Sequence, residues 1–246
     1  MRHVPLGPKN IPIVHVHWSQ AWRIIASRYP PVALFERVSS NPGVWDALIE
    51  LEQATNPRVR DQVGEIRLVP PDRRVSGPNA SWAMACFTHV NPNGSRFSDG
   101  SYGVYYCANR LETAIAETAH HFEIFARDSN DPARREDMRV LLGSIDTSFH
   151  DAGVLKGKHR AAILNPDSYI ASRALAIALR NNDSNGITYP SVRDAMGHCV
   201  AAFWPNVFGI PLQERHLQYD WDGERVARYF DYSFEKWIDM PPRISV

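Results

Sequence analysis

The stretch from Asn91 to Phe125 constrains the fold most, because it passes from a turn-rich loop through a short strand into a helix within a few residues. Its first thirteen residues contain three glycines and Pro92, and such clusters mark turns whose backbone needs freedom. The apolar and aromatic run 104–108 suits a buried strand. The run 111–125, rich in Ala and Glu, suits a helix. The sequence therefore predicts a loop–strand–helix unit that the rest of the chain supports.

Helical spacing separates one carboxylate from the packed face of this predicted helix. The apolar stripe consists of residues at i, i+4, i+7 and i+11, namely Leu111, Ile115, Thr118 and Phe122. Each residue turns a helix by about 100°, so Glu117 lies roughly 130° from that stripe. Its helical neighbours are small on one side and imidazoles on the other: Thr113, Ala114, His120 and His121. The helix alone leaves two interpretations open: a carboxylate in a partly open polar pocket, or a solvated surface glutamate.

The spacing of four residues resembles the RES domain, a family named for its Arg, Glu and Ser. Arg96, Tyr106 and Glu117 fall ten and eleven residues apart, on the predicted loop, strand and helix. The blocks G-x-R, Y-x-A and A-x-x-E match residues 94–96, 106–108 and 114–117, and the later G-I-x-Y-P-S block ends at Ser191. The resemblance covers roughly residues 34 to 210. One departure is that the usual G-G-R-W-N around the arginine is here Gly-Ser-Arg-Phe-Ser.

The resemblance implies a function. RES proteins are toxin halves of bacterial toxin–antitoxin pairs, consume NAD, and have a fold similar to ADP-ribosyltransferases. It implies an Xre-like antitoxin as partner, to which DNA contact is delegated, and it is compatible with a homodimer inside the complex. It also implies a cytoplasmic protein that needs no metal. The acceptor of ADP-ribose stays open between a protein side chain, water and phosphate.

The implied chemistry assigns a role to each residue. Cleavage of the nicotinamide–ribose bond builds positive charge on the ribose, which a carboxylate such as Glu117 would stabilise. Tyr106 would hold the nicotinamide by stacking or through its hydroxyl. Arg96 suits contact with the diphosphate, and Arg37, on a predicted strand, either adds a second phosphate contact or lies at a rim. Ser191 would bond the phosphate, the ribose or Glu117. The alternative functions are a nucleotide-binding module without catalysis and an interaction protein that uses these residues as a polar network.

Composition bounds the class of protein. The 246 residues carry 27 basic and 27 acidic side chains, so no single-sign field favours nucleic acid as a direct partner. We expect a single RES-type domain over residues 1–246, with residues 1–80 including a helical extension. No run approaches the ~18 apolar residues of a membrane span. The three cysteines lie in apolar runs without a C-x-x-C pattern, which predicts reduced thiols.

The remaining patterns predict an α+β fold, with compact mixed or antiparallel sheets and flanking helices, because strands and helices do not alternate regularly. The predicted helices cover residues 19–27, 42–55 and 165–180, the last beginning at Asn165-Pro166. The predicted strands cover residues 32–38, 66–69, 81–90, 138–145, 187–191, 198–203, 213–219 and 225–232. Asp222-Gly223 is the predicted turn before the last strand, and residues 149–160 are predicted as loop.

Overall fold

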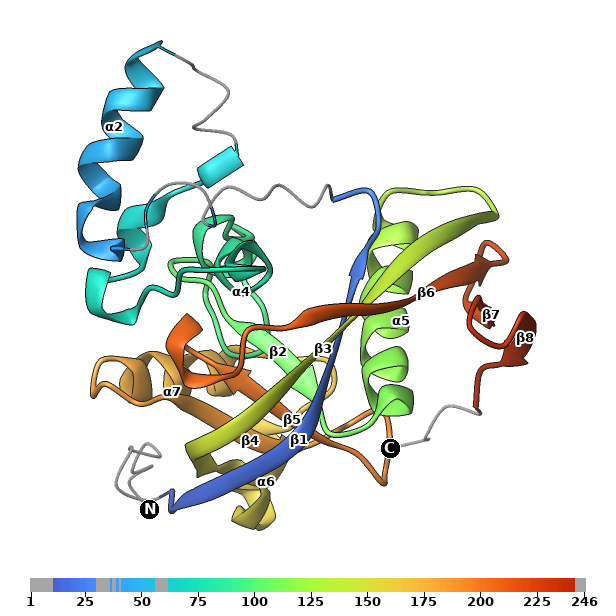
Figure 1. Ribbon diagram of the computed structural model, residues 1–246. Coiled ribbons are helices and arrows are strands. Elements are labelled where there is room, and N and C mark those ends of the chain that lie inside the picture. Colours follow the sequence, from blue (N-terminus) through green and yellow to red (C-terminus); the bar gives the residue numbers. More distant parts are fainter. Residues whose placement is uncertain (1–10, 30–35, 37–38, 40, 56–61, 242–246) are drawn as a thin grey trace.

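The protein is described by a computed structural model that covers residues 11–29, 36, 39, 41–55 and 62–241 (Figure 1). Eight strands form one sheet: β1 (Ile13–Ala26), β2 (Tyr105–Ala108), β3 (Arg134–Asp151), β4 (Gly186–Pro190), β5 (His198–Ala202), β6 (Leu212–Trp221), β7 (Val226–Asp231) and β8 (Lys236–Asp239). The α-helices are α2 (Trp45–Thr55), α4 (Ala80–Thr88), α5 (Leu111–Asp128), α6 (Gly157–Ile163) and α7 (Ile170–Arg180). Short 3-10 turns occupy Pro42–Val44, Ile66–Leu68, Pro71–Arg73, Ala152–Val154 and Pro205–Val207.

The sheet closes on itself over five of its strands. Its order is β1-β2-β5-β4-β3-β6-β7-β8, and β1 pairs additionally with β3, so the first five strands in this order form a ring. Pairing is antiparallel throughout except between β3 and β4. The strands β6 to β8 extend the sheet away from the ring, and α5 runs beside β1 (Figure 1). This arrangement confirms the α+β class.

The first strand corrects the predicted helix over residues 19–27. β1 runs from Ile13 to Ala26 and pairs with β3, but the register shifts between Trp18 and Ala21. Ahead of this irregularity Val16 is buried, and beyond it Ala21 and Trp22 are both buried. The extra residue disrupts the two-residue period of the strand. The apolar positions around Trp22 therefore fit a helical spacing although the segment is extended.

The predicted strand over residues 81–90 is also wrong. Helix α4 covers Ala80–Thr88, and its buried residues recur at helical spacing: Ala80, Ala83, Met84, Phe87 and Thr88. A short apolar run cannot by itself distinguish a strand from a buried helix. The segment predicted as a strand at 66–69 is a 3-10 turn. The predicted loop 149–160 contains the end of β3, the 3-10 turn Ala152–Val154 and the first four residues of α6. The strand predicted at 32–38 lies outside the described residues except for residue 36.

Other predictions are confirmed. The 42–55 helix, the 104–108 strand and the 111–125 helix correspond to Pro42–Thr55, β2 and α5. The strands predicted near 138, 187, 198, 213 and 225 correspond to β3 to β7, although β3 is longer than predicted. The predicted turn is present, since Asp222 Oδ1 accepts hydrogen bonds from the backbone of Glu224 and Arg225, and Gly223 has a φ of 103°. Strand β8 was not predicted.

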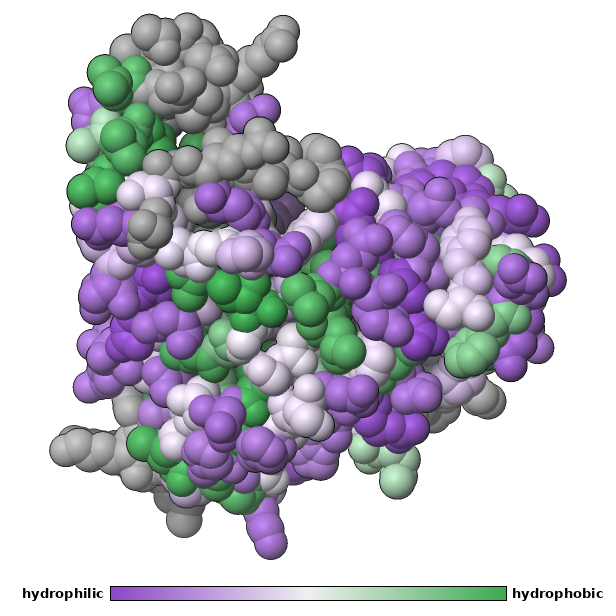
Figure 2. All heavy atoms as spheres, viewed as in Figure 1, coloured by the Kyte–Doolittle hydropathy of each residue, from purple (hydrophilic) through white to green (hydrophobic). Residues whose placement is uncertain are grey.

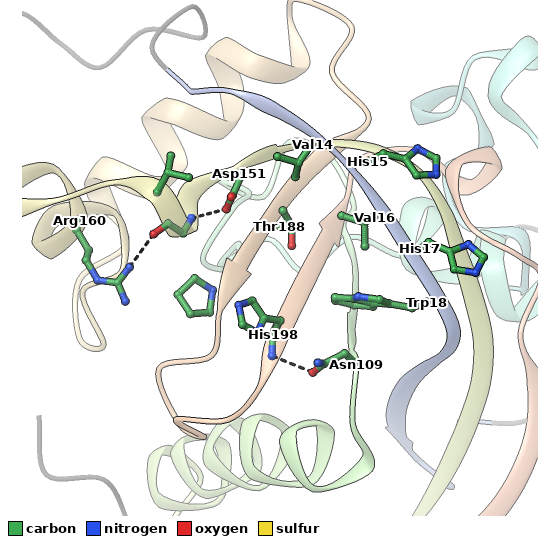
Figure 3. Close-up of a pocket in the computed structure, with 13 residues that line it drawn as sticks. Val14, His15, Val16, His17, Trp18, Asn109, Asp151, Arg160, Thr188 and His198 are labelled. Carbon is green, nitrogen blue, oxygen red and sulfur yellow. Dashed lines mark hydrogen bonds between the residues drawn. The ribbon is translucent and has the colours of Figure 1, made fainter.

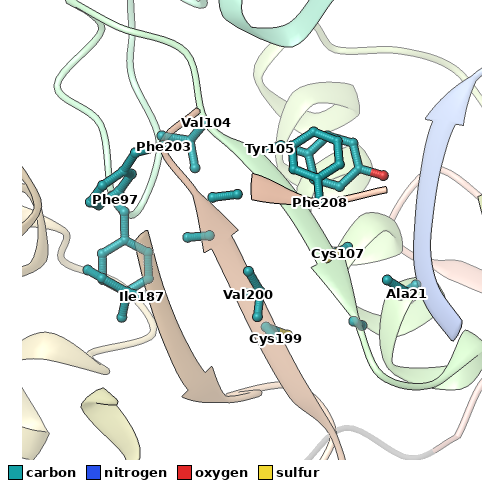
Figure 4. Packing of buried hydrophobic residues seen from close by; sticks show 14 of the residues in the cluster. Ala21, Phe97, Val104, Tyr105, Cys107, Ile187, Cys199, Val200, Phe203 and Phe208 are labelled. Atoms are coloured by element: carbon teal, nitrogen blue, oxygen red, sulfur yellow. The ribbon is translucent and has the colours of Figure 1, made fainter. Parts of the chain in front are cut away.

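The core lies inside and around the ring. Tyr105 stacks on Phe208 with ring centroids 3.9 Å apart, next to Cys107 and Val200 (Figure 4). All three cysteines are free, with Cys107 and Cys199 buried. Burial raises the pKa of the Cys107 thiol to about 12, which leaves it uncharged and unreactive at neutral pH.

The molecular surface is uneven in polarity. Hydrophilic residues cover most of the β6 to β8 region, and apolar residues gather on α2 (Figure 2). Val44, Leu48 and Leu51 expose 40%, 38% and 69% of their surface, at helical spacing. Within the described part of the chain, no helix is long and apolar enough to cross a membrane.

Candidate active site

The centre of the candidate site is a contact between a helix and the end of a strand. Glu117 lies on α5, and Ser191 follows the last residue of β4. The Ser191 hydroxyl donates a 2.6 Å hydrogen bond to Glu117 Oε1. Glu117 is half-buried and Ser191 is buried. The glutamate is therefore held in a polar contact and is not an ordinary solvated residue of an amphipathic helix.

The serine oxygen is itself fixed by the backbone. Its Oγ accepts hydrogen bonds from the backbone N–H groups of Arg193 and Asp194, each at 3.0 Å. This leaves the hydroxyl proton to point at Glu117. The loop after Ser191 is tied to α5, because Thr113 Oγ1 donates a 2.5 Å hydrogen bond to Asp194. The position of the carboxylate thus depends on one short loop packed on one helix.

The loop before β2 presents Arg96 to the same region, and we call its residues 93–98 the arginine loop. A Cβ on Gly94, whose φ is 72°, would lie 2.4 Å from the Ser98 carbonyl oxygen, so this turn requires glycine. The turn is closed by a 2.8 Å hydrogen bond from the Ser95 N–H to the Ser98 oxygen. Gly94 therefore adopts a backbone conformation that other residues rarely adopt, as the glycine-rich sequence of this loop predicts.

Tyr106 ties the arginine loop to the sheet. Its hydroxyl lies 2.7 Å from Ser95 Oγ and accepts a 3.0 Å hydrogen bond from the Phe97 N–H. Burial raises the pKa of Tyr106 to about 12, although hydrogen bonds to Ser95 and Phe97 and the charge of Arg96 act in the opposite direction. The phenol is therefore protonated at neutral pH. These bonds flank Arg96 on both sides and set the direction of its backbone; the contact of Tyr106 with nicotinamide stays a prediction.

Arg96 is only 7% exposed. Its Nη1 donates a 2.6 Å hydrogen bond to the Asn165 carbonyl oxygen, and its guanidinium lies 4.6 Å from the centre of the Tyr169 ring. These contacts hold a planar cation with five N–H donors, of which the Asn165 contact uses one. The segment that begins with Asn165-Pro166 is thus part of the site, although α7 begins only at Ile170.

Two further arginines were missed by the sequence analysis. Arg173 on α7 donates to the carbonyl oxygens of Asn93 and Ser95, each at 2.9 Å, and so supports the arginine loop. Arg193 lies 2.7 Å from His120 Nε2 and donates to the Pro166 oxygen at 3.0 Å. The sequence signal for Arg193 was its position two residues after Ser191. No local signal marks Arg173, because its partners are about 80 residues away.

The electrostatics show that these groups share one environment. Burial raises the pKa of Tyr189 well above its ordinary value; Glu117 and Tyr106 raise it further, while Arg96 lowers it. The Tyr189 ring also packs edge-on against Phe97 at 5.0 Å. Tyr189 on β4 therefore packs against the loop that carries Arg96.

His121 marks the side of the site that faces solvent. Part of the residue is exposed, yet loss of solvation lowers the pKa of its imidazole. Glu117 raises that pKa, and Arg96 and Arg193 lower it. An imidazole sensitive to one carboxylate and two guanidinium groups lies at the edge of the same charged cluster.

The structure thus brings together Glu117, Ser191, Tyr106 and Arg96. Arg37 lies outside the described residues, so its predicted phosphate contact stays a prediction. A fixed carboxylate can stabilise a positive charge that develops on a bound substrate. Guanidinium groups in the same site can bind an anionic group of that substrate. Among the described residues there is no group of three His, Cys, Asp or Glu side chains arranged to hold a metal ion.

Comparison with known proteins identifies the family. The RES domain profile matches residues 71–222, which is more than half of the chain and includes these four site residues. The chain therefore belongs to the RES domain family. It is 26% identical over 211 residues to "Uncharacterized protein y4oC" of Sinorhizobium fredii (strain NBRC 101917 / NGR234), covering 86% of each chain. It is also similar to the crystal structure of the M. tuberculosis MbcT–MbcA toxin–antitoxin complex, with a TM-score of 0.42, 10% identity, and coverage of 83% of this chain and 85% of that chain.

Proposed function

We propose that this protein is a RES toxin that cleaves the nicotinamide–ribose bond of NAD. The observation that carries the proposal is the 2.6 Å hydrogen bond from Ser191 to Glu117, which holds a half-buried carboxylate beside the arginine loop. This arrangement supports the role that the family resemblance implies for each of these residues.

In the proposed reaction the bonding electron pair leaves with the pyridine nitrogen, which neutralises the pyridinium ring. Positive charge then develops on the ribose, where Glu117 stabilises it electrostatically. A nucleophilic oxygen or nitrogen of the acceptor forms the new bond to the ribose carbon and loses its proton to solvent. A protein side chain, water and phosphate all satisfy this chemistry, so the acceptor is left open.

The arginine loop supports the binding of the NAD diphosphate. The guanidinium of Arg96 is held by the Asn165 carbonyl oxygen and by the Tyr169 ring, so little conformational entropy is lost when it binds phosphate oxygens. Arg173 donates to the Ser95 carbonyl oxygen, and the Tyr106 hydroxyl bonds the Ser95 hydroxyl and the Phe97 N–H, so the residues on both sides of this arginine are held. Pre-organisation of this kind favours ground-state binding of an anion.

The direct test is release of nicotinamide. Purified protein is incubated with NAD, and free nicotinamide and the ADP-ribose product are quantified by chromatography and mass spectrometry. Released nicotinamide in wild-type protein, lost on Glu117→Gln, supports the enzyme. Tight NAD binding without release would support the alternative of a nucleotide-binding module. Neither binding nor release would favour an interaction protein that uses these residues as a polar network.

Substitution of Arg96 should weaken NAD binding. We expect Arg96→Ala to raise the Kd for NAD about tenfold or more, because a hydrogen bond to a charged group contributes about 1.5–3 kcal/mol. Arg96→Lys should recover only part of the affinity, since it keeps the charge but loses the planar fork. Binding is measured by calorimetry in a Glu117→Gln background, so that turnover does not consume the ligand. The matched control is Arg225→Ala, whose side chain is 68% exposed; equal losses for both arginines would contradict the assignment.

Toxicity and its neutralisation are the second expected result. Expression of the chain alone in bacteria should stop growth and lower cellular NAD or modify a protein, and Glu117→Gln should relieve this. Co-expression with the protein encoded by the neighbouring gene, expected to be an Xre-like antitoxin, should restore growth and co-purify with the chain. Unchanged growth at confirmed soluble expression would contradict the toxin assignment.

A further inference from the structure

The wall of the five-stranded ring is incomplete beside the first half of β1. Over residues 13–18 β1 pairs with β3 on one side, whereas on the other side β2 pairs with β1 only at Trp22 and Ala108. Asn109 directly follows β2, and it exchanges hydrogen bonds with His198 at the start of β5. Among the described residues no strand pairs with residues 14–18 on the side away from β3. Within the part of the chain that the structure describes, this segment of β1 therefore presents an unpaired strand edge.

A pocket of about 610 Å³ opens at this gap. Its lining includes five consecutive residues of β1, from Val14 to Trp18. Figure 3 shows Val14, Val16 and Trp18 on the side of β1 that faces Thr188 and His198, whereas the His15 and His17 side chains lie on the opposite side of the strand. Since these two side chains point away, the backbone of β1 itself borders the pocket. We call this pocket the strand slot.

The strand slot is separate from the candidate active site. Side chains of successive strand residues point to opposite faces. Tyr189 on β4 packs against Phe97 of the arginine loop, whereas Thr188 and Pro190 line the slot. A ligand in the slot would therefore lie on the other face of β4 from the pair formed by Glu117 and Ser191.

We propose that the strand slot binds an extended peptide segment of a partner protein by strand addition to β1. Such binding uses main-chain hydrogen bonds for affinity and side-chain pockets for specificity. A strand of about five residues spans about 17 Å and would match the free stretch of β1. This proposal does not rest on the proposed activity toward NAD.

The lining predicts the chemistry of the segment. The polar groups at the bottom of the slot already have partners: Thr188 donates to the Cys199 carbonyl oxygen, and Asn109 Oδ1 accepts from the His198 N–H. Asp151 and Arg160 also line the pocket, and each bonds the backbone of Gly153. The apolar part of the lining includes Val14, Val16, Trp18 and Pro190. Burying a polar side chain there without a partner would cost free energy. The segment should therefore carry small or medium apolar residues at every second position and polar residues between them.

The test begins with selection of displayed random heptapeptides on the full-length protein, with counter-selection on Val14→Lys. The lysine places a charge in the slot. His15→Lys is the control, because the His15 side chain follows directly after Val14, is 60% exposed and points away from the slot. Melting curves establish that both variants are folded. The selected peptide should bind Val14→Lys about tenfold or more weakly than it binds the wild-type protein. It should bind His15→Lys as tightly as wild type, since only the lysine at position 14 occupies the space that the peptide side chains would fill.

Two measurements on the wild-type protein test strand addition without any substitution in the slot. A twin peptide with N-methyl groups on alternate amides should lose about tenfold or more in affinity, because it cannot form the ladder hydrogen bonds. Hydrogen exchange should show alternate amides of residues 14–18 exchanging rapidly in the free protein and protected by the peptide. Failure to select any peptide with apolar residues at alternate positions would overturn the proposal. So would equal binding of the N-methylated twin, which indicates recognition by side chains alone. Full protection of these amides in the free protein would also overturn it, because the edge would then be occupied already.

Discussion

Replacement of Glu117 by glutamine should abolish nicotinamide release while leaving the fold and most NAD affinity intact. Glutamine keeps the shape and can still accept the hydrogen bond from Ser191, which is 2.6 Å long in the wild-type protein. It removes the negative charge that would stabilise the ribose as the bond breaks. An interaction that is stronger in the transition state than in the ground state affects the chemical step and not binding. The expected loss in kcat is about two to three orders of magnitude.

The matched control for this result is Glu112→Gln on the same helix. The Glu112 side chain is 64% exposed and lies 3.5 Å from Arg110. Its replacement should change stability by at most roughly 0.5 kcal/mol and leave turnover unchanged. The comparison requires kcat, the Kd for NAD and melting curves for wild type and both variants. Near-wild-type turnover in Glu117→Gln would remove this carboxylate from the proposed mechanism.

Replacement of Gly186 by alanine should be the most damaging small substitution in the motif that ends at Ser191. Gly186 has a φ of 143°, and a Cβ there would lie 2.1 Å from the Ala201 carbonyl oxygen of the paired strand. Both the backbone conformation and the contact oppose any side chain. We expect a loss of roughly 2–5 kcal/mol in the free energy of unfolding, measured by urea denaturation. The glycine of this motif is thus required by the pairing of β4 with β5.

Gly223→Ala separates the effect of the positive φ from the effect of the close contact between strands. Gly223 also has a positive φ, 103°, but no atom lies within 4 Å of its would-be Cβ. The substitution should therefore cost only the conformational strain, about 1–2 kcal/mol. If Gly186→Ala is no more destabilising than Gly223→Ala, then the close approach of the two strands does not constrain this position.

Much of the site could be predicted from the sequence because its signals are local. The glycine-rich loop, the short strand and the amphipathic helix each depend on residues a few positions apart, and all three are present around Gly94, Tyr106 and Glu117. The prediction was weaker where a local irregularity hid the pattern. The shift in β1 between Trp18 and Ala21 displaces the apolar period, so a strand was predicted as a helix.

Long-range packing decided other elements. The apolar run containing Met84 and Phe87 is compatible with a strand or with a buried helix. In the structure it forms α4, whose residues at helical spacing are buried in the core. The polar ends of β3 extend beyond its apolar centre because β1 and β6 supply hydrogen-bonding partners along its whole length. The start of α7, in contrast, is decided locally. Asn165 Oδ1 accepts hydrogen bonds from the backbone N–H groups of Asp167 and Ser168, which form a turn, and the helix begins after it at Ile170.

Residue types and their spacing were sufficient to indicate the family and to name Arg96, Tyr106, Glu117 and Ser191, because these depend on motifs that are short in sequence. The hydrogen bond between Glu117 and Ser191 joins residues 74 positions apart, and it exists because the loop after β4 is packed on α5. The support of the arginine loop by Arg173 and the unpaired edge of β1 have the same origin. Contacts between distant segments depend on how strands pair and helices pack, which local sequence preference does not specify. Only the tertiary structure could therefore show which side chains meet and which edge of β1 has no paired strand among the described residues.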